Sequence, residues 1–115
     1  MDDYLAAIYR LGDARDPVRL TDLALALGLS KSSVSRAVGI LCERGLLTHS
    51  RYGNIVLTDE GFALGRAIQA RREVFKRFLI EILGLPADVA AADAGRLEHA
   101  ASPDTAVALE RFVNR

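Results

Sequence analysis

The sequence contains a single cysteine and carries no net charge, and these two features exclude an internal disulfide and a generally basic composition. One cysteine, Cys42, cannot form a disulfide within the chain. We interpret it as core filler, with a redox switch or an intermolecular disulfide as the alternative. With 15 basic and 15 acidic residues, the chain does not have the composition of a generally basic nucleic-acid binder.

Long apolar runs and catalytic motifs are also missing. No apolar run has membrane-spanning length, and the N-terminus begins with acidic MDDY instead of a basic signal segment. We therefore expect a cytoplasmic protein. The sequence has no nucleotide-binding glycine loop and no serine, cysteine or histidine arrangement that suggests a nucleophile with its base. An enzyme is not expected.

The stretch from Thr21 to Gly61 predicts a helix-turn-helix followed by a β-wing. Apolar residues recur at helical spacing from Leu20 to Leu27, and Gly28 follows where a helix end favours a left-handed residue. Ser30 is placed to cap a second helix. The apolar arc of that helix is Val34, Ala37, Val38 and Leu41. The opposite face then holds Ser32, Ser35, Arg36, Gly39 and Glu43.

This opposite face has the residue types that read DNA. Small side chains allow a close approach to the duplex, and an arginine can donate two parallel hydrogen bonds to a guanine edge. We expect base contacts from Ser32, Ser35 and Arg36. The remaining predicted DNA-binding residues, mostly phosphate contacts, are Thr21, Ser30, Lys31, Ser33, Arg51 and Tyr52. The alternative is that the serines are only helix caps and solvent-facing filler.

Two strands predicted at 46–50 and 54–57 form the wing, joined by Arg51, Tyr52 and Gly53. Thr58 is expected to cap the next helix. Basic residues outnumber acidic ones between positions 31 and 51, whereas acidic residues predominate after position 78. Because so few basic contacts bind DNA weakly, we infer that two copies act together on a two-part site.

Helical spacing extends over most of the rest of the chain. We expect a first helix that Gly12 ends, a long helix from Asp59 to Leu83, and two final helices at 87–100 and 104–114. The basic residues in the middle of the long helix predict a solvated face, with an approach of part of it to the DNA backbone as the alternative: Arg66, Arg71, Arg72, Lys76 and Arg77. Apolar residues in the final helices favour dimerisation there.

The predicted fold is therefore mainly α with a small β-wing. A winged helix-turn-helix DNA-binding domain is expected at residues 1–63. An all-helical dimerisation module, with a possible metal-sensing role, is expected at residues 64–115.

Three segments together resemble a known family. These are MDDYLAAIYRL, the stretch LTDLALALGLSKSSVSRAVGILCERGLL with RYGNIVLTDEG, and the late Leu97-Glu98-His99. They resemble the metal-dependent repressors of the diphtheria toxin repressor and manganese transport regulator family. The resemblance implies a homodimeric repressor that binds DNA and is controlled by Mn²⁺ or Fe²⁺. A winged-helix regulator of the MarR kind that responds to a non-metal ligand, or a winged-helix protein-interaction module, is the alternative.

The resemblance implies that Asp3, Glu98 and His99 are metal ligands, and two carboxylates with an imidazole suit Mn²⁺ or Fe²⁺. The sequence departs from the family at three other positions. Ala6 and Gly95 stand where the family has further ligands, and Arg72 replaces a histidine. Two mechanisms follow. Either the three residues still hold one metal ion, or the site is vestigial and Arg72 pairs with Glu98 or Asp3 in place of the metal.

Overall fold

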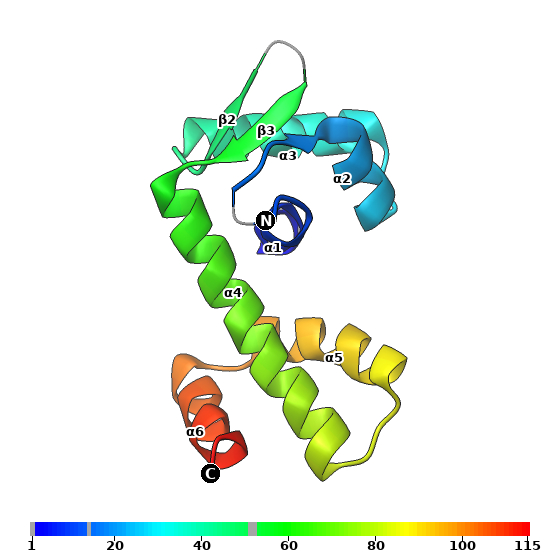
Figure 1. Cartoon of the computed structure of the whole chain (residues 1–115), viewed down its shortest axis with the longest axis vertical. Coiled ribbons are helices and arrows are strands. Elements are labelled where there is room, and N and C mark those ends of the chain that lie inside the picture. The colour runs from blue at the N-terminus through cyan, green and yellow to red at the C-terminus, as the bar shows by residue number, and fades with distance from the viewer. Residues whose placement is uncertain (1, 14, 51–52) are drawn as a thin grey trace. The chain divides into compact units, whose positions relative to one another are not determined.

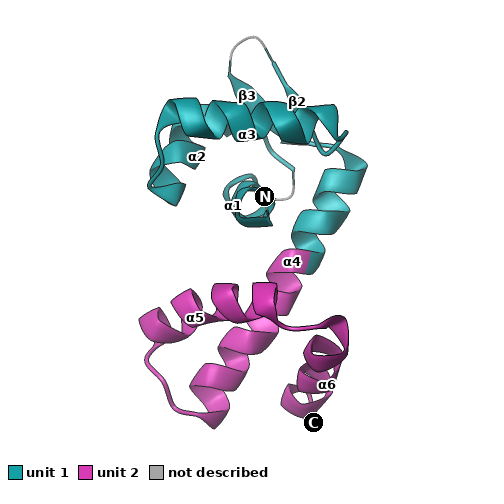
Figure 2. Ribbon diagram, turned by 180° about the vertical axis from the view of Figure 1, so that it is seen from behind, with its two compact units in different colours: residues 1–67 teal, residues 68–115 magenta. Residues whose placement is uncertain are grey.

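The computed structural model describes residues 2–13, 15–50 and 53–115 and is mainly helical, with one small antiparallel sheet (Figure 1). The elements are α1 (Asp2–Leu11), β1 (Val18–Arg19), α2 (Leu20–Leu27), α3 (Lys31–Glu43), β2 (Leu47–His49), β3 (Asn54–Leu57), α4 (Asp59–Arg77), the π-helix η1 (Phe78–Ile82), α5 (Ala87–Ala100) and α6 (Pro103–Val113). The chain forms two compact units, residues 1–67 and residues 68–115, so the division falls inside α4 (Figure 2).

The helix-turn-helix has the predicted boundaries. Gly28 ends α2 with a φ of 67°, in the left-handed region that glycine adopts without strain. Ser30 caps α3, because its Oγ accepts a hydrogen bond from the N–H of Ser33 at 3.2 Å. Val34, Ala37, Val38 and Leu41 are buried, so the apolar arc of α3 faces the core as its spacing predicts.

The wing consists of β2 and β3, which pair antiparallel with Leu47 opposite Leu57. The sheet has a third strand that the sequence did not predict. Strand β1 pairs with β3 through Val18 and Ile55, which gives the order β1-β3-β2. A strand of two residues is too short to show an alternating pattern, so only its partner reveals it. Residues 51 and 52, two of the predicted DNA contacts, lie outside the described residues.

The start of α4 is hydrogen-bonded to the turn that follows α3. The Thr58 hydroxyl accepts a hydrogen bond from the N–H of Gly61 at 3.1 Å and donates one to the carbonyl of Gly45 at 2.7 Å. Thr58 is therefore the predicted cap of α4, and it also binds the turn that leads into the wing.

The second unit has a small core of Phe75, Ala94 and Ala106, with Ala101 and Leu109 packed against it. Helix α5 has the predicted bounds, and α6 begins at Pro103 after its Ser102 cap. The long helix expected from Asp59 to Leu83 is present, from Asp59 to Ile82, but its last part is not α-helical. The chain is α-helical only to Arg77 and then π-helical, with the N–H of Leu83 bonded to the carbonyl of Phe78.

None of the described helices is by itself both long enough and apolar enough to cross a membrane. Helices α2 and α3 reach that threshold only when taken together, as a pair bent by 112°.

Candidate nucleic-acid interface and buried carboxylate cluster

The outer face of α3 is the candidate nucleic-acid interface. Ser32, Ser35, Arg36, Gly39 and Glu43 are all exposed, as the helical spacing predicts. At Gly39, an added Cβ would meet no heavy atom within 4 Å, so the backbone there borders open space. A ligand as large as a duplex can therefore approach the backbone closely at this point.

The N-terminal end of α3 carries hydroxyl groups and positive potential. The Oγ of Ser30 lies 3.2 Å from the Oγ of Ser32 and donates to the Oγ of Ser33 at 2.9 Å. The first turn holds Lys31 and no acidic residue, and the helix dipole adds a partial positive charge. This end of the helix therefore suits a phosphate. Thr21 is exposed in the first turn of α2.

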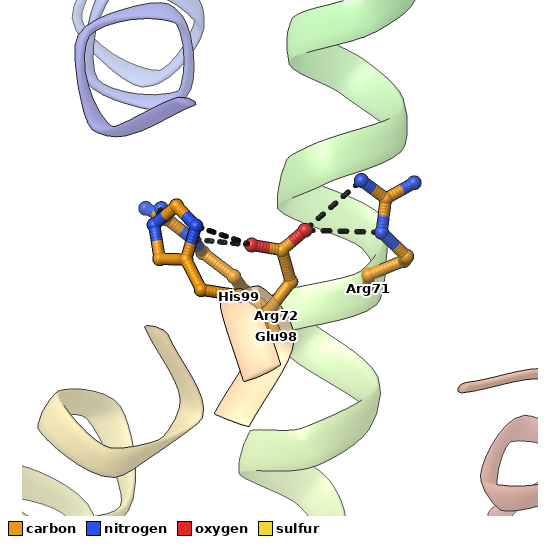
Figure 3. Close-up of polar contacts among 4 residues, drawn as sticks. All are labelled: Arg71, Arg72, Glu98 and His99. Carbon is orange, nitrogen blue, oxygen red and sulfur yellow. Dashed lines mark hydrogen bonds and ion pairs between the residues drawn. The ribbon is translucent and has the colours of Figure 1, made fainter. Parts of the chain in front are cut away.

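A buried carboxylate lies in the second unit, where Glu98 of α5 meets two arginines of α4 (Figure 3). The side chain of Glu98 is only 2% exposed. Its Oε1 accepts hydrogen bonds from Arg71, at 3.0 Å from Nε and 2.9 Å from Nη2. A buried carboxylate retains its charge only when it is paired, and Arg71 supplies that pairing.

The other carboxylate oxygen, Glu98 Oε2, faces Arg72 and His99 (Figure 3). The Nε of Arg72 lies 3.8 Å from it, and the Nδ1 of His99 lies 3.9 Å from it. The Nη2 of Arg72 is also 3.4 Å from the Nε2 of His99. Because a guanidinium group only donates, this contact requires Nε2 to be the acceptor and leaves the ring proton on Nδ1.

The structure brings the predicted site residues Arg72, Glu98 and His99 together. It adds Arg71, which was not predicted as a site residue. Arg72 lies at ion-pair distance from Glu98, the pairing that the vestigial alternative named. Arg71 was expected on a solvated face, and this was wrong because it binds Glu98 directly. The partner lies 27 residues away, and no local pattern indicates it. Asp3 is exposed in the first turn of α1, in the first unit.

Comparison with known proteins identifies the family. Residues 1–55 match the family described as "Iron dependent repressor, N-terminal DNA binding domain". Residues 58–115 match "Iron dependent repressor, metal binding and dimerisation domain". The chain therefore belongs to the iron-dependent repressor family, which comprises metal-dependent DNA-binding repressors of the diphtheria toxin repressor and manganese transport regulator type. The MarR-like alternative is not favoured.

Individual relatives agree with this assignment. The chain is 31% identical over its whole length to an uncharacterized HTH-type transcriptional regulator of Methanocaldococcus jannaschii, covering 93% of it. It is 32% identical over 86% of its length to the HTH-type transcriptional regulator MntR of Bacillus subtilis, covering 69% of that protein. A solved manganese-dependent transcriptional repressor in complex with manganese has 31% identity and a TM-score of 0.89 over 98% of this chain. This chain spans 52% of that structure, about half its length.

Mn²⁺ or Fe²⁺ is the cofactor class of this family, so the donors of the second unit can be tested against a divalent ion. A carboxylate and an imidazole are suitable ligand types. Here, however, Glu98 Oε1 already accepts two hydrogen bonds from Arg71. Oε2 is buried without a hydrogen bond, but a guanidinium group lies beside it. The imidazole lone pair of His99 points to Arg72. Within the second unit, a divalent cation would therefore have to displace Arg72 to reach these donors.

Proposed function

We propose that the whole protein is a dimeric, sequence-specific DNA-binding repressor that acts in the cytoplasm and has no enzymatic activity. The observation that carries this proposal is the exposed outer face of α3, with its hydroxyl-rich, positively charged start, beside a β-wing. A winged helix with such a face inserts the second helix of its helix-turn-helix, here α3, into the major groove. In this proposal residues 1–63 bind DNA and residues 64–115 hold two copies together.

Each DNA-contacting residue has a role that follows from its chemistry. Arg36 reads a guanine edge with two donors, and Ser32 and Ser35 contact neighbouring base edges. The other residues hold phosphates and position the helix without reading sequence. These positioning residues are Thr21, Ser30, Lys31, Ser33, Arg51 and Tyr52.

The first experiment tests sequence reading by Arg36. A duplex is enriched from a random library with the parent protein, and its affinity is compared with that of a scrambled duplex by fluorescence anisotropy. Arg36→Ala is expected to lower the preference for the enriched duplex about tenfold or more, because one bidentate base contact is lost. Arg96→Ala is the control, since Arg96 is an exposed arginine of α5 in the second unit. An Arg36→Ala variant that keeps the full preference would contradict the assigned reading face.

Salt dependence separates DNA binding from a role in protein assembly alone. If phosphate contacts hold the duplex, raising the salt from about 50 to about 200 mM lowers the affinity steeply, because condensed counterions are released on binding. A winged helix that only mediates protein assembly would show no duplex binding, or binding that does not change with salt. That result would overturn the proposal.

The signal that controls the regulator is a separate question. The metal mechanism, in which Asp3, Glu98 and His99 hold Mn²⁺ or Fe²⁺, stays a prediction. Calorimetric titration of the chelator-treated protein tests it directly. Binding tighter than about micromolar that disappears in an Asp3→Ala, His99→Ala double variant would support the metal mechanism. The contacts around Glu98 support the other mechanism.

A further inference from the structure

We propose that Arg71 and Arg72 balance the charge of Glu98 in place of a divalent cation, so that DNA binding by this protein does not require added metal. The part of this inference that concerns DNA rests on the function proposed above. The part that concerns metal binding stands on the second unit alone.

The buried carboxylate of Glu98 has its charge balanced within the second unit. Glu98 lies on the buried side of α5, beside Ala90 and Ala94, and its side chain is 2% exposed. A negative charge in such a place needs a positive partner. Arg71 fills this role with two hydrogen bonds to Oε1, at 2.9 and 3.0 Å. The carboxylate is therefore neutralised by the chain itself.

Arg72 restricts access to Glu98 Oε2. The side chain of Arg72 is 14% exposed, and its Nε lies 3.8 Å from this oxygen. An arginine does not lose its proton in proteins, so this charge cannot be removed by a change of pH. A divalent cation at Oε2 would stand beside a fixed positive charge at contact distance and would be repelled. It would have to displace Arg72 to bind.

His99, the other candidate donor of this unit, also contacts Arg72. Its Nε2 lies 3.4 Å from the Nη2 of Arg72, and the ring proton is then on Nδ1. A histidine coordinates a metal through a nitrogen lone pair, and here that lone pair accepts from Arg72. The same arginine thus blocks both the carboxylate and the imidazole.

The consequence is a permanent link between α4 and α5. Where a metal ion joins two helices, the link forms and dissolves with the metal concentration. Two guanidinium groups on one carboxylate are part of the chain and do not leave. The second unit therefore keeps this packing at any metal concentration.

The experiment begins with the chelator-treated parent protein, titrated with Mn²⁺, Zn²⁺ and, without oxygen, Fe²⁺. Calorimetry is expected to show no binding tighter than about micromolar. The affinity for the enriched duplex is expected to change less than about twofold when metal is added, whereas a metal-controlled regulator changes about fivefold or more. Tight binding of any of these ions, or a fivefold gain in DNA affinity, would overturn the inference.

A gain-of-function variant tests the cause. The Arg71→Gln, Arg72→His double variant removes both cations and adds an imidazole beside Glu98. It is expected to bind Mn²⁺ or Zn²⁺ at least about tenfold more tightly than the parent, with a metal-dependent rise in melting temperature. Arg96→Gln is the control, because it removes an arginine from an exposed ion pair of the same unit. If the double variant binds metal no better than the parent, the arginines are not what excludes the ion.

A folding failure of the variant and a loss of duplex binding are each kept separate from the question of metal binding. If the double variant does not fold, the single Arg72→His variant is titrated in its place under the same criterion. If the parent fails to bind duplex at every metal concentration, the proposed DNA-binding function is overturned. Calorimetry still decides the metal question in that case, because it uses no DNA.

Discussion

At the residue scale, Glu98 shows how burial changes the contribution of an ion pair to stability. An exposed pair contributes little to stability, whereas removing one partner of a buried pair leaves an uncompensated charge. The second unit contains both kinds on α5. Glu98 is almost fully buried against two arginines, and Asp93 holds Arg96 at 3.1 Å on the surface, where the arginine side chain is 80% exposed.

This contrast gives a matched pair of variants. Glu98→Gln is expected to lower the free energy of unfolding by about 2 kcal/mol, less than for a fully buried pair because Arg71 is partly exposed. Asp93→Asn, which also converts a carboxylate to an amide, is expected to change it by less than about 0.5 kcal/mol. Urea denaturation at one fixed protein concentration measures both. Equal effects of the two substitutions would contradict the role of burial.

A second residue-scale prediction concerns Cys42. Partial burial raises the pKa of its thiol, because desolvation disfavours the thiolate. A raised pKa means less thiolate at pH 8, so alkylation by iodoacetamide is expected to be slower in the folded protein than in urea. The rate in the folded protein should also keep rising at a pH where the unfolded chain has reached its maximum. A folded thiol that reacts as fast as the unfolded one would contradict this prediction.

At the scale of the element, local signals determined where helices start and stop. The Ser30 and Thr58 caps are where the sequence predicted them, because a cap depends on residues within one turn. Glycines at 28 and 45 end helices in the left-handed region for the same local reason. The buried arc of α3 was predicted because helical spacing fixes which side chains share a face.

Two glycines of the first unit give a prediction at this scale. A Cβ added to Gly61 in α4 would overlap the backbone carbonyl of Leu46, which has no flexible end to move aside. Gly61→Ala is therefore expected to lower the free energy of unfolding by about 2 kcal/mol or more. Gly39→Ala in α3 meets nothing within 4 Å, so it is expected to raise it by about 0.5 to 1 kcal/mol.

Thermal and urea denaturation of the two variants measure these opposite signs. A Gly61→Ala variant as stable as the parent would mean that α4 can shift relative to the Leu46 backbone at little cost. Duplex binding by Gly39→Ala adds a functional readout. Gly39 lies on the exposed outer face of α3, which we propose reads DNA. A stabilised variant with weakened DNA affinity would therefore support close approach of the duplex there.

At the scale of the whole molecule, the second unit leaves large apolar side chains exposed. Leu83, just after η1, is 56% exposed, and Leu97 in α5 is 39% exposed. Exposed apolar side chains on neighbouring elements are typical of a subunit interface. They agree with the dimerisation domain that the family description assigns to residues 58–115.

We therefore expect self-association through this surface. A Leu83→Asp, Leu97→Asp double variant should weaken dimerisation at least about tenfold, because two charges would be buried in an apolar interface. Leu25→Asp is the control, since Leu25 is 84% exposed in the first unit. Sedimentation velocity over a range of concentrations measures the effect. A parent protein that stays monomeric, or a control that dissociates as readily, would contradict this interface.

The sequence by itself determined where most helices begin and end and which side of α3 is exposed. Caps, glycines and helical spacing act within a few residues, so Ser30, Gly28 and the exposed side of α3 follow from the chain alone. The resemblance of the sequence to metal-dependent repressors also indicated Glu98, His99 and Arg72 as residues to examine.

Only the tertiary structure decided what surrounds those residues. Strand β1 exists because β3 pairs with it, and Arg71 binds Glu98 because α4 and α5 bring residues 27 positions apart into contact. The energy of a buried charge depends on all of its neighbours, whichever part of the chain supplies them. A sequence pattern can name a carboxylate, but packing decides whether an arginine holds it.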